Sequence, residues 1–366
     1  MSNEFRELLK RVGSGTHTSK NLSRAEAATA TRMMLLCSAT PAQIGAFMIA
    51  HRIKRPTPEE LAGILDAFDQ LGNKLQICPQ HQHSPVVLGN PYDGRSRTVP
   101  VTIITGLILA TANVPAVFHG GDCMPTKYGI PLIEIWQQLG VDFSQCNLAQ
   151  AQSIYNQSNL GFIYLPQHFP AAHNFVTFRE QIGKRPPFST AELVWCPVAA
   201  QSHLVAGFVH PPTEERFREA FKIRQTKDFT LVKGLEGSCD LARSRTGIIA
   251  LSTSEENNSE NDFQRLLLDP TDYELNGSDI TLESPIQAIA LINEVIQGKN
   301  SSLFPAAILN GGFYLWRFGI AKTLESGFAL AESMLSTGKV ADKLAQLQSV
   351  ITTVKEHPDQ QSVNVS

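Results

Sequence analysis

Two polar loops, separated by an apolar segment of helical length, constrain this chain more than any other feature. Residues 89–94 read Gly-Asn-Pro-Tyr-Asp-Gly, and residues 119–129 begin His-Gly-Gly-Asp. The short apolar runs 85–89 and 114–118 predict buried strands, and residues 101–111 predict a helix between them. In open α/β sheets, ligands bind where loops leave the carboxyl ends of the strands. The sequence therefore predicts a βαβ unit whose two polar loops face one substrate crevice.

Composition narrows the class of protein further. The chain has 366 residues and is 42% apolar, which is enough for a large α/β domain and a smaller one. A net charge of −3, from 31 basic and 34 acidic residues, gives no global attraction to nucleic acid. Any such binding must come from a local basic patch.

The sequence also gives no sign of a membrane helix, a CxxC motif or a histidine metal site. No apolar run approaches the roughly 20 residues of a membrane helix, and the polar start is no signal peptide, so we expect a cytoplasmic protein with no membrane partner. The six cysteines form no CxxC pair, which indicates free thiols. His81 and His83 are the only close histidine pair, and a solvated linker explains them better than a metal site.

Residues 1–72 predict a small helical domain. Ser23 to Glu26 and Thr57 to Glu60 are capping boxes, and Thr40 followed by proline starts another helix in the same way. Apolar side chains at Ile44, Phe47 and Met48 fall near one face of that helix. Because so small a layer buries little by itself, we expect this face to form a homodimer.

The rest of the chain predicts a larger α/β domain. Residues 73–84 are polar and aperiodic, as in a hinge, and residues 85–355 alternate strands with helices. Further strands are expected at 161–165, 204–209, 229–232 and 247–251, and helices at 132–139, 174–182 and 214–222. This alternation predicts a mostly parallel sheet. Residues 253–262 read as a polar loop, the chain beyond 284 as helical, and residues 356–366 as a disordered tail.

Several segments together resemble one known family. They are residues 40–54, 57–61, the two polar loops, 161–168, 232–237 and 306–310. The chain resembles the anthranilate phosphoribosyltransferase family, also called glycosyltransferase family 3. The resemblance implies a helical dimerisation domain hinged to an α/β domain, which agrees with the layout predicted from the residues.

The resemblance also implies a binding site for phosphoribosyl pyrophosphate and Mg²⁺. Active members cradle the diphosphate with Gly-Thr-Gly-Gly-Asp-Gly, where this chain has residues 89–94. The implied donor-binding residues are Gly89, Asp93, Gly94, Thr102, His119, Gly120 and Lys127. Arg179 matches the arginine that contacts the aromatic acceptor, and Asp240 is what remains of an Asp-Glu pair that holds magnesium.

The chain departs from the family pattern inside both loops. Pro91 lacks the N–H that a phosphate cradle uses, and Tyr92 places a ring there. Apolar Val101 and Phe118 replace a polar and a basic residue, and Asp122 replaces an arginine. We therefore predict that phosphoribosyl transfer to anthranilate is absent or very weak.

These departures resemble a divergent subgroup of the family that is associated with nucleic-acid binding. The candidate contacts to nucleic acid are Arg95, Arg97, Lys184, Arg185, Arg243 and Arg245. The alternative for this basic region is a solvated face balanced by Glu214, Glu215 and Glu219. Two interpretations stay open: a transferase with an atypical donor site, and a non-catalytic protein that binds nucleic acid without strong sequence preference.

Overall fold

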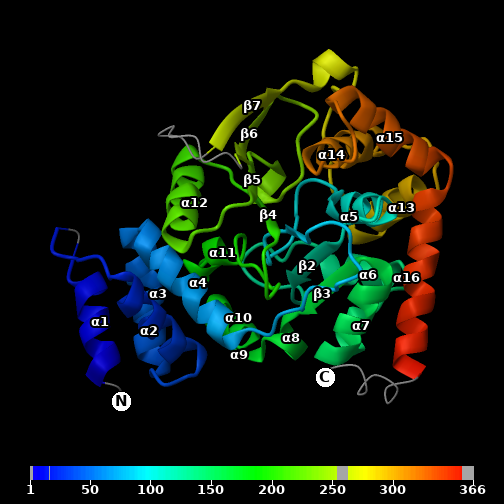
Figure 1. Cartoon of the computed structure of the whole chain (residues 1–366). Coiled ribbons are helices and arrows are strands. Elements are labelled where there is room, and N and C mark those ends of the chain that lie inside the picture. The colour runs from blue at the N-terminus through cyan, green and yellow to red at the C-terminus, as the bar shows by residue number, and fades with distance from the viewer. Residues whose placement is uncertain (1–2, 16, 254–262, 357–366) are drawn as a thin grey trace.

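A layer of helices forms the first part of the chain (Figure 1). The computed structural model describes residues 3–15, 17–253 and 263–356. The layer consists of α1 (Asn3–Gly13), α2 (Arg24–Leu35), α3 (Pro41–Lys54) and α4 (Pro58–Leu71). The capping boxes predicted at the starts of α2 and α4 are confirmed, and α3 begins with one as well. Each box satisfies two backbone donors that the helix itself leaves unpaired, so the sequence marks these helix starts well.

One buried carboxylate ties the helical layer together. Glu60 accepts from the backbone N–H groups of Leu22 and Thr57, and it lies 2.8 Å from Lys54 Nζ and 3.2 Å from His51 Nε2. Although burial raises it, the pKa of Glu60 is held down at about 2, first by His51. The charged form of Glu60 therefore stabilises the packing of α3 and α4.

The helical layer buries the residues that were expected to face a partner. Ile44, Phe47 and Met48 are at most 3% exposed, and the Phe47 ring lies 5.4 Å from that of Phe5 in α1. The prediction that this face cannot bury itself is wrong, because α1 covers it. The large apolar side chains that the layer does expose are Leu36, at 57%, and Ile53, at 74%.

A mostly parallel sheet forms the second part of the chain. Its strands are β1 (Val86–Leu88), β2 (Ala116–Gly120), β3 (Leu160–Tyr164), β4 (His203–Gly207), β5 (Phe229–Val232), β6 (Gly247–Ser252) and β7 (Phe263–Leu268). Their order is β3-β2-β1-β4-β5-β6-β7. Neighbours from β3 to β5 pair in parallel, and β5, β6 and β7 pair antiparallel. The predicted fold class is confirmed, and β7 is a strand that the sequence did not predict.

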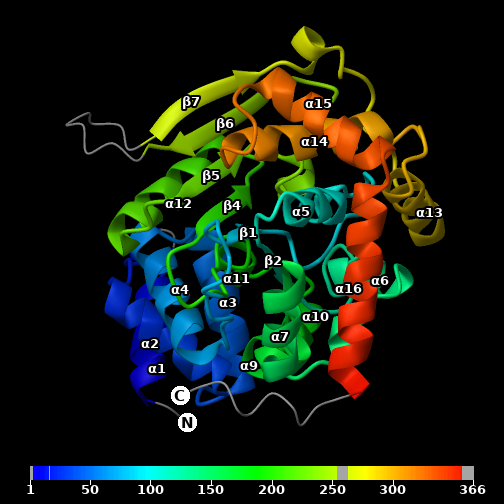
Figure 2. The ribbon, with the colours of Figure 1, turned by 45° about the vertical axis from the view of Figure 1, so that its right-hand side comes forward.

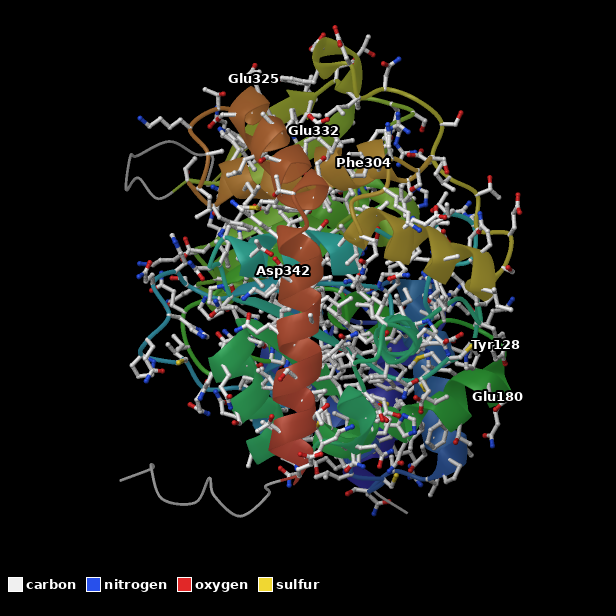
Figure 3. The ribbon with its side chains drawn as sticks, turned by 90° about the vertical axis from the view of Figure 1, so that its right-hand side faces the viewer. Tyr128, Glu180, Phe304, Glu325, Glu332 and Asp342 are labelled. Atoms are coloured by element: carbon white, nitrogen blue, oxygen red, sulfur yellow. The ribbon has the colours of Figure 1, made fainter. Side chains whose placement is uncertain are left out.

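Helices cover both faces of this sheet. After β1 the chain continues through α5 (Thr102–Thr111), α6 (Leu132–Gln138), η1 (Phe143–Gln145), α7 (Leu148–Ser158), α8 (Leu165–His168), α9 (Pro170–His173), α10 (Phe175–Ile182), α11 (Phe188–Ala191), α12 (Pro211–Arg224), η2 (Leu235–Gly237), η3 (Pro270–Tyr273), α13 (Pro285–Ile296), α14 (Phe304–Arg317), α15 (Leu324–Ser336) and α16 (Lys339–Glu356). The long α16 runs along one side of the molecule, with the exposed Asp342 on it (Figure 3). The loop before α6 reaches the surface at Tyr128, which is 58% exposed.

Two hydrophobic cores lie on opposite faces of the sheet. Val86 and Leu88 of β1 join the core formed with α5 and α13 to α16, whereas Val87 joins the core formed with the helical layer, α11 and α12. Successive side chains of a strand point to opposite faces, which explains this division. Phe68 of α4 packs against Phe169 and Trp195, so the helical layer shares a core with the α/β part. Figure 2 shows α12 above α3 and α4 at this junction.

The predictions for the hinge, the polar loop and the C-terminal tail have different outcomes. Leu75, within the predicted hinge 73–84, is buried and pairs with Val198, and its role as a hinge stays a prediction. The predicted polar loop 253–262 lies outside the described residues except for its first residue, and the predicted tail 356–366 lies outside them after Glu356. Over the described part of the chain, no helix is long and apolar enough to span a bilayer.

Candidate functional site

Four loops meet beyond the carboxyl ends of the central strands. They follow β1, β2, β4 and β5, and the strand order reverses between β1 and β4. Such reversal points are the usual ligand sites of open α/β sheets. The backbone is closely packed here, because a Cβ on Gly89 would lie 2.2 Å from the Leu193 carbonyl oxygen. Gly94, with a φ of 74°, lies directly against Gly129. Glycine is therefore required at both positions.

The side chain of Arg95 fills the centre of this site. Its guanidinium donates to Glu236 Oε1 at 3.2 Å and to Asp240 Oδ2 at 2.8 Å, and also to the hydroxyls of Ser238 and Thr98. Arg95 is only 3% exposed. Charge-assisted bonds to two buried carboxylates neutralise it inside the protein. Arg95 therefore does not lie on the exposed basic surface predicted from the sequence, because its charge and donors are used within the site.

Glu236 joins the loop after β1 to the loop after β5. Its carboxylate accepts from the backbone N–H groups of Arg97 and Thr98, both at 3.0 Å, and from that of Ser96 at 3.2 Å. Lys127 Nζ, from the loop after β2, lies 3.4 Å away. Although burial raises it, the pKa of Glu236 is held down at about 2, first by Arg95. Three of the four crevice loops are thus held together around one anion.

Asp240 caps the N-terminus of α5. Its Oδ1 accepts from Thr102 Oγ1 at 2.7 Å, and its Oδ2 accepts from the Val101 N–H at 3.0 Å. Val101 provides no side-chain cap to α5, so the carboxylate of Asp240 satisfies this helix end and complements its dipole. Asn90 Oδ1 lies 3.2 Å from the same Thr102 hydroxyl. The predicted site residues Thr102 and Asp240 therefore do lie together, but they bond to each other.

The residues around Asp240 do not fit the magnesium ion that the family resemblance implies. Both oxygens of Asp240 already accept hydrogen bonds, one of them from the cationic Arg95. The neighbouring Cys239 is buried, and burial raises the pKa of its thiol well above the usual range. Magnesium prefers oxygen ligands in open octahedral geometry. Within the described ranges, no group of three or more His, Cys, Asp or Glu side chains is arranged to hold a metal ion.

The position of the implied phosphate cradle is occupied by an aromatic cluster. Tyr92 is 5% exposed, and its hydroxyl lies 2.5 Å from Nδ1 of His119. The His119 ring packs edge-on against Trp195, with centroids 5.6 Å apart. Burial lowers the pKa of His119 to about 3, so the ring is neutral. Gly120 lies against the same Tyr92 ring. A neutral, apolar cluster at this point offers little to a diphosphate.

The arginine predicted to contact an aromatic acceptor is paired with a carboxylate of the chain itself. Arg179 is 2% exposed and donates to Glu192 Oε1 at 2.9 Å and to Ser189 Oγ at 2.8 Å. The cavity beside it, lined by Phe68, Tyr92 and other apolar side chains, has a volume of only about 20 Å³. That volume is close to what a single water molecule needs. The aromatic acceptor implied by the family resemblance does not fit here.

The other basic residues predicted from the sequence differ in exposure and in their partners. Arg97, Lys184 and Arg245 are exposed, and the Arg97 side chain reaches 75%. Arg243 donates to the backbone carbonyls of residues 275 and 276. Arg185 forms an ion pair with Asp93, which places the predicted Asp93 at the crevice edge beside a cation.

A separate groove gathers arginines that the sequence did not single out together. Arg52 and Arg55 from the end of α3, Arg185, and Arg216 of α12 line a groove of about 540 Å³ between the helical layer and the α/β part. Its remaining lining is mostly proline, and none of the described residues that line it is a carboxylate. Burial, followed by the charge of Arg55, lowers the pKa of Arg216. We call this feature the arginine groove.

Hydrogen bonds to backbone hold the walls of the arginine groove in place. Arg52 Nη1 donates to the Arg185 carbonyl oxygen at 2.6 Å, and Arg216 Nε donates to the Pro56 carbonyl oxygen at 2.7 Å. Each bond uses only one donor, so the other guanidinium N–H groups are available to a ligand. Arg55 has a φ of 68°, which is uncommon for a residue other than glycine and is often found at binding sites.

Sequence reasoning missed the carboxylates that complete the site. Glu236 lies in the segment 232–237 that carried the family resemblance, but its role depends on a contact with Arg95, which is 141 positions away. Glu192 likewise pairs with Arg179 through the fold. The charge of segment 52–55 was a visible signal for the arginine groove, but nothing in the sequence places it beside Arg216.

Comparisons with known proteins identify the class and then the family. Anthranilate phosphoribosyltransferase of Thermus thermophilus shares the fold, with a TM-score of 0.74 at 19% identity over 96% of this chain and 100% of that one. The Saccharomyces cerevisiae enzyme in complex with PRPP and Mg has a TM-score of 0.79 at 13% identity, over 96% and 99%. The fold is thus that of anthranilate phosphoribosyltransferases.

The sequence itself places the chain in a family. The helical bundle domain of a glycosyl transferase family matches residues 6–72, and the a/b domain of the same family matches residues 93–341. The chain belongs to this glycosyl transferase family. Its relatives include the anthranilate phosphoribosyltransferase of Afipia carboxidovorans, 26% identical over 95% of this chain and 98% of the relative. They also include an uncharacterized protein of Aquifex aeolicus, 25% identical over 86% and 93%.

Proposed function

We propose that this protein is a member of its family that binds nucleic acid through the arginine groove and does not transfer phosphoribosyl groups to anthranilate. The observation that carries the proposal is the grouping of Arg52, Arg55 and Arg216 along a groove whose described lining has no carboxylate, with Arg185, which is paired to Asp93, beside them. Clustered guanidinium groups bind phosphates, and such contacts supply most of the affinity for nucleic acid whatever its sequence. A net charge of −3 does not oppose this, because the binding is local.

The donor site supports the first part of this proposal. Arg95 is bound to Glu236 and Asp240, and Tyr92 fills the phosphate cradle. Phosphoribosyl pyrophosphate would meet carboxylates that are already neutralised and a loop in which Pro91 offers no N–H donor. The alternative function, phosphoribosyl transfer through an altered donor site, requires that these contacts open. A steady-state assay with phosphoribosyl pyrophosphate, Mg²⁺ and anthranilate tests it, and turnover of about 1 per second would contradict our proposal.

The salt dependence of nucleic-acid binding tests the second part. Fluorescence anisotropy measures the affinity for a labelled single-stranded oligonucleotide over a series of salt concentrations. If phosphates are the main contacts, the logarithm of affinity falls linearly with the logarithm of salt. The Arg52→Ala/Arg55→Ala variant is expected to lower the slope by about 1.4, because each phosphate contact to a single strand contributes roughly 0.7.

A matched variant keeps this test specific. Arg6 and Lys322 are exposed and lie outside the groove lining, so Arg6→Ala/Lys322→Ala removes the same charge elsewhere. We expect it to leave the slope within experimental error of the wild type. Equal effects of the two double variants would show that net charge, rather than the arginine groove, attracts the nucleic acid.

We also propose that the protein is a homodimer through the exposed apolar side chains of its helical layer. Leu36 and Ile53 are the basis of this proposal, since burial of large apolar side chains drives most association. Ile53→Glu is expected to yield a monomer in light scattering, with unchanged circular dichroism. A monomeric wild type at micromolar concentration would contradict it.

A further inference from the structure

A small crevice adjoins the arginine groove. It has a volume of about 210 Å³ and is lined in part by Pro91, Asp93 and Glu192, with Phe208 behind them. Both hollows share four lining residues, namely Arg185, Thr190, His210 and Thr213. The crevice is smaller than the roughly 300 Å³ at which pockets for drug-sized ligands begin, so it suits one small ring rather than a whole nucleotide.

The two hollows differ in polarity. Guanidinium groups line the arginine groove, whereas the crevice adds the carboxylates of Asp93, Glu192 and Glu236 to Arg185, which lines both hollows. Asp93, which lines the crevice, accepts from Arg185 through Oδ2. Glu192 Oε2 is buried and has no hydrogen-bond partner among the described residues, while its Oε1 accepts from Arg179 at 2.9 Å. A carboxylate oxygen left in this state inside a crevice favours a ligand that donates N–H groups.

A nucleotide matches both polarities when its phosphate and its base occupy different hollows. We infer that the crevice binds an unstacked base through its exocyclic amino group while the arginine groove binds the flanking phosphates. This inference rests on the proposed nucleic-acid-binding function and adds the part of the ligand that enters the crevice. Carboxylates pair with the amino group of cytosine in known base recognition, and adenine also carries an amino group. Thymine has no amino group, and its single N3–H donor lies between two carbonyl oxygens, which face Glu192 and Asp93 unfavourably.

The geometry also selects the form of the nucleic acid. A base inside a duplex keeps its amino group in the base pair, and moving it into a pocket requires unstacking and unpairing. Single strands offer unstacked bases at much lower cost. A free phosphate is disfavoured in the crevice itself, since Asp93, Glu192 and Glu236 all line it. The ligand class is therefore single-stranded nucleic acid with amino-bearing bases.

Homopolymers separate the base from the phosphates. Single-stranded dC, dA and dT oligonucleotides of equal length, about 15 nucleotides, offer the same number of phosphates. The wild-type protein is expected to bind dC and dA about tenfold more tightly than dT in fluorescence anisotropy at one fixed salt concentration. This comparison needs no variant, so it does not depend on whether a substitution folds.

Glu192→Gln then tests the residue itself. The amide oxygen can still accept from Arg179, but the amide N–H₂ now donates toward the base, so we expect the preference for dC over dT to disappear or reverse. Glu219, an exposed residue of α12 outside both linings, gives the control variant Glu219→Gln, which should keep the wild-type preference. Equal affinities of the wild type for dC, dA and dT would overturn the inference. So would a preference that Glu192→Gln leaves unchanged.

The failure of this inference differs from the failure of the proposed function. If the protein binds all three homopolymers equally and with a steep salt dependence, the arginine groove still binds phosphates and the crevice takes no base. If no homopolymer binds at low salt, the proposed nucleic-acid-binding function itself fails.

Discussion

Arg95 and Arg216 belong to the same residue type, but the protein uses them in opposite ways. Arg95 lies between Glu236 and Asp240 with its donors satisfied and its side chain buried. Arg216 lies in a groove beside Arg55, and burial together with that like charge lowers its pKa. The first environment stabilises the closed crevice, and the second leaves positive charge available. The contrast shows that ion pairing within the chain decides which arginines can serve a ligand.

The largest expected effect is on stability. Arg95→Met leaves Glu236 and Asp240 buried without their main cation, which should cost roughly 3–5 kcal/mol of unfolding free energy. Arg216→Met removes a cation that pairs with no carboxylate in its groove, and we expect a loss below about 1 kcal/mol. Urea unfolding followed by circular dichroism measures both. Losses of similar size would remove the distinction between the two arginines.

Exchange of arginine for lysine sharpens the same contrast with a smaller effect. Arg95→Lys keeps the charge but cannot bond to Glu236, Asp240, Ser238 and Thr98 together, so we expect a loss of roughly 1–3 kcal/mol. Arg216→Lys should keep oligonucleotide affinity within about threefold, because phosphate attraction depends mainly on charge. A strong loss of affinity in Arg216→Lys would indicate bidentate recognition of one phosphate instead.

The pH dependence of stability distinguishes the Arg95 site, where Glu236 titrates in acid, from the arginine groove around Arg216. Glu236 and Glu60 have folded-state pKa values lowered from 4.5 to about 2. Their stabilisation is therefore fully present above about pH 4.5 and is lost as pH falls toward 2, with a slope of roughly 1 kcal/mol per pH unit for each of the two groups. Glu236→Gln should reduce this slope in acid unfolding measurements. Arg216→Met should leave it as in the wild type, since arginine does not titrate in this range.

The sequence predicted the fold through features that act locally. Capping boxes at Ser23 and Thr57 and the apolar runs around the two loops involve residues close in the chain, so their pattern is visible without the fold. Strand β7 was missed because it lies on the antiparallel edge, where its central residues are partly exposed and break the buried pattern of the other strands.

The candidate site could be predicted only in part, because only its local features are visible in the sequence. Gly89 and Gly94 belong to the loop that the family resemblance singled out, and the backbone is closely packed at both, while their role in binding stays a prediction. Arg97 is exposed, but Arg95, which was predicted with it as a contact to nucleic acid, is buried. The turn of its side chain toward Glu236 and Asp240 depends on residues about 140 positions away. Partnerships of this kind are set by the fold, and no single-sequence pattern carries them.

Calorimetric titration with phosphoribosyl pyrophosphate, in the presence and absence of Mg²⁺, tests the central claim most directly. The claim is that the chain's own arginine occupies the centre of the crevice, and that ligand phosphates bind only in the arginine groove. We expect weak binding of the ligand that does not depend on Mg²⁺ and that the Arg52→Ala/Arg55→Ala variant abolishes. Tight, Mg²⁺-dependent binding that this variant retains would show that the donor site is functional and would contradict the account.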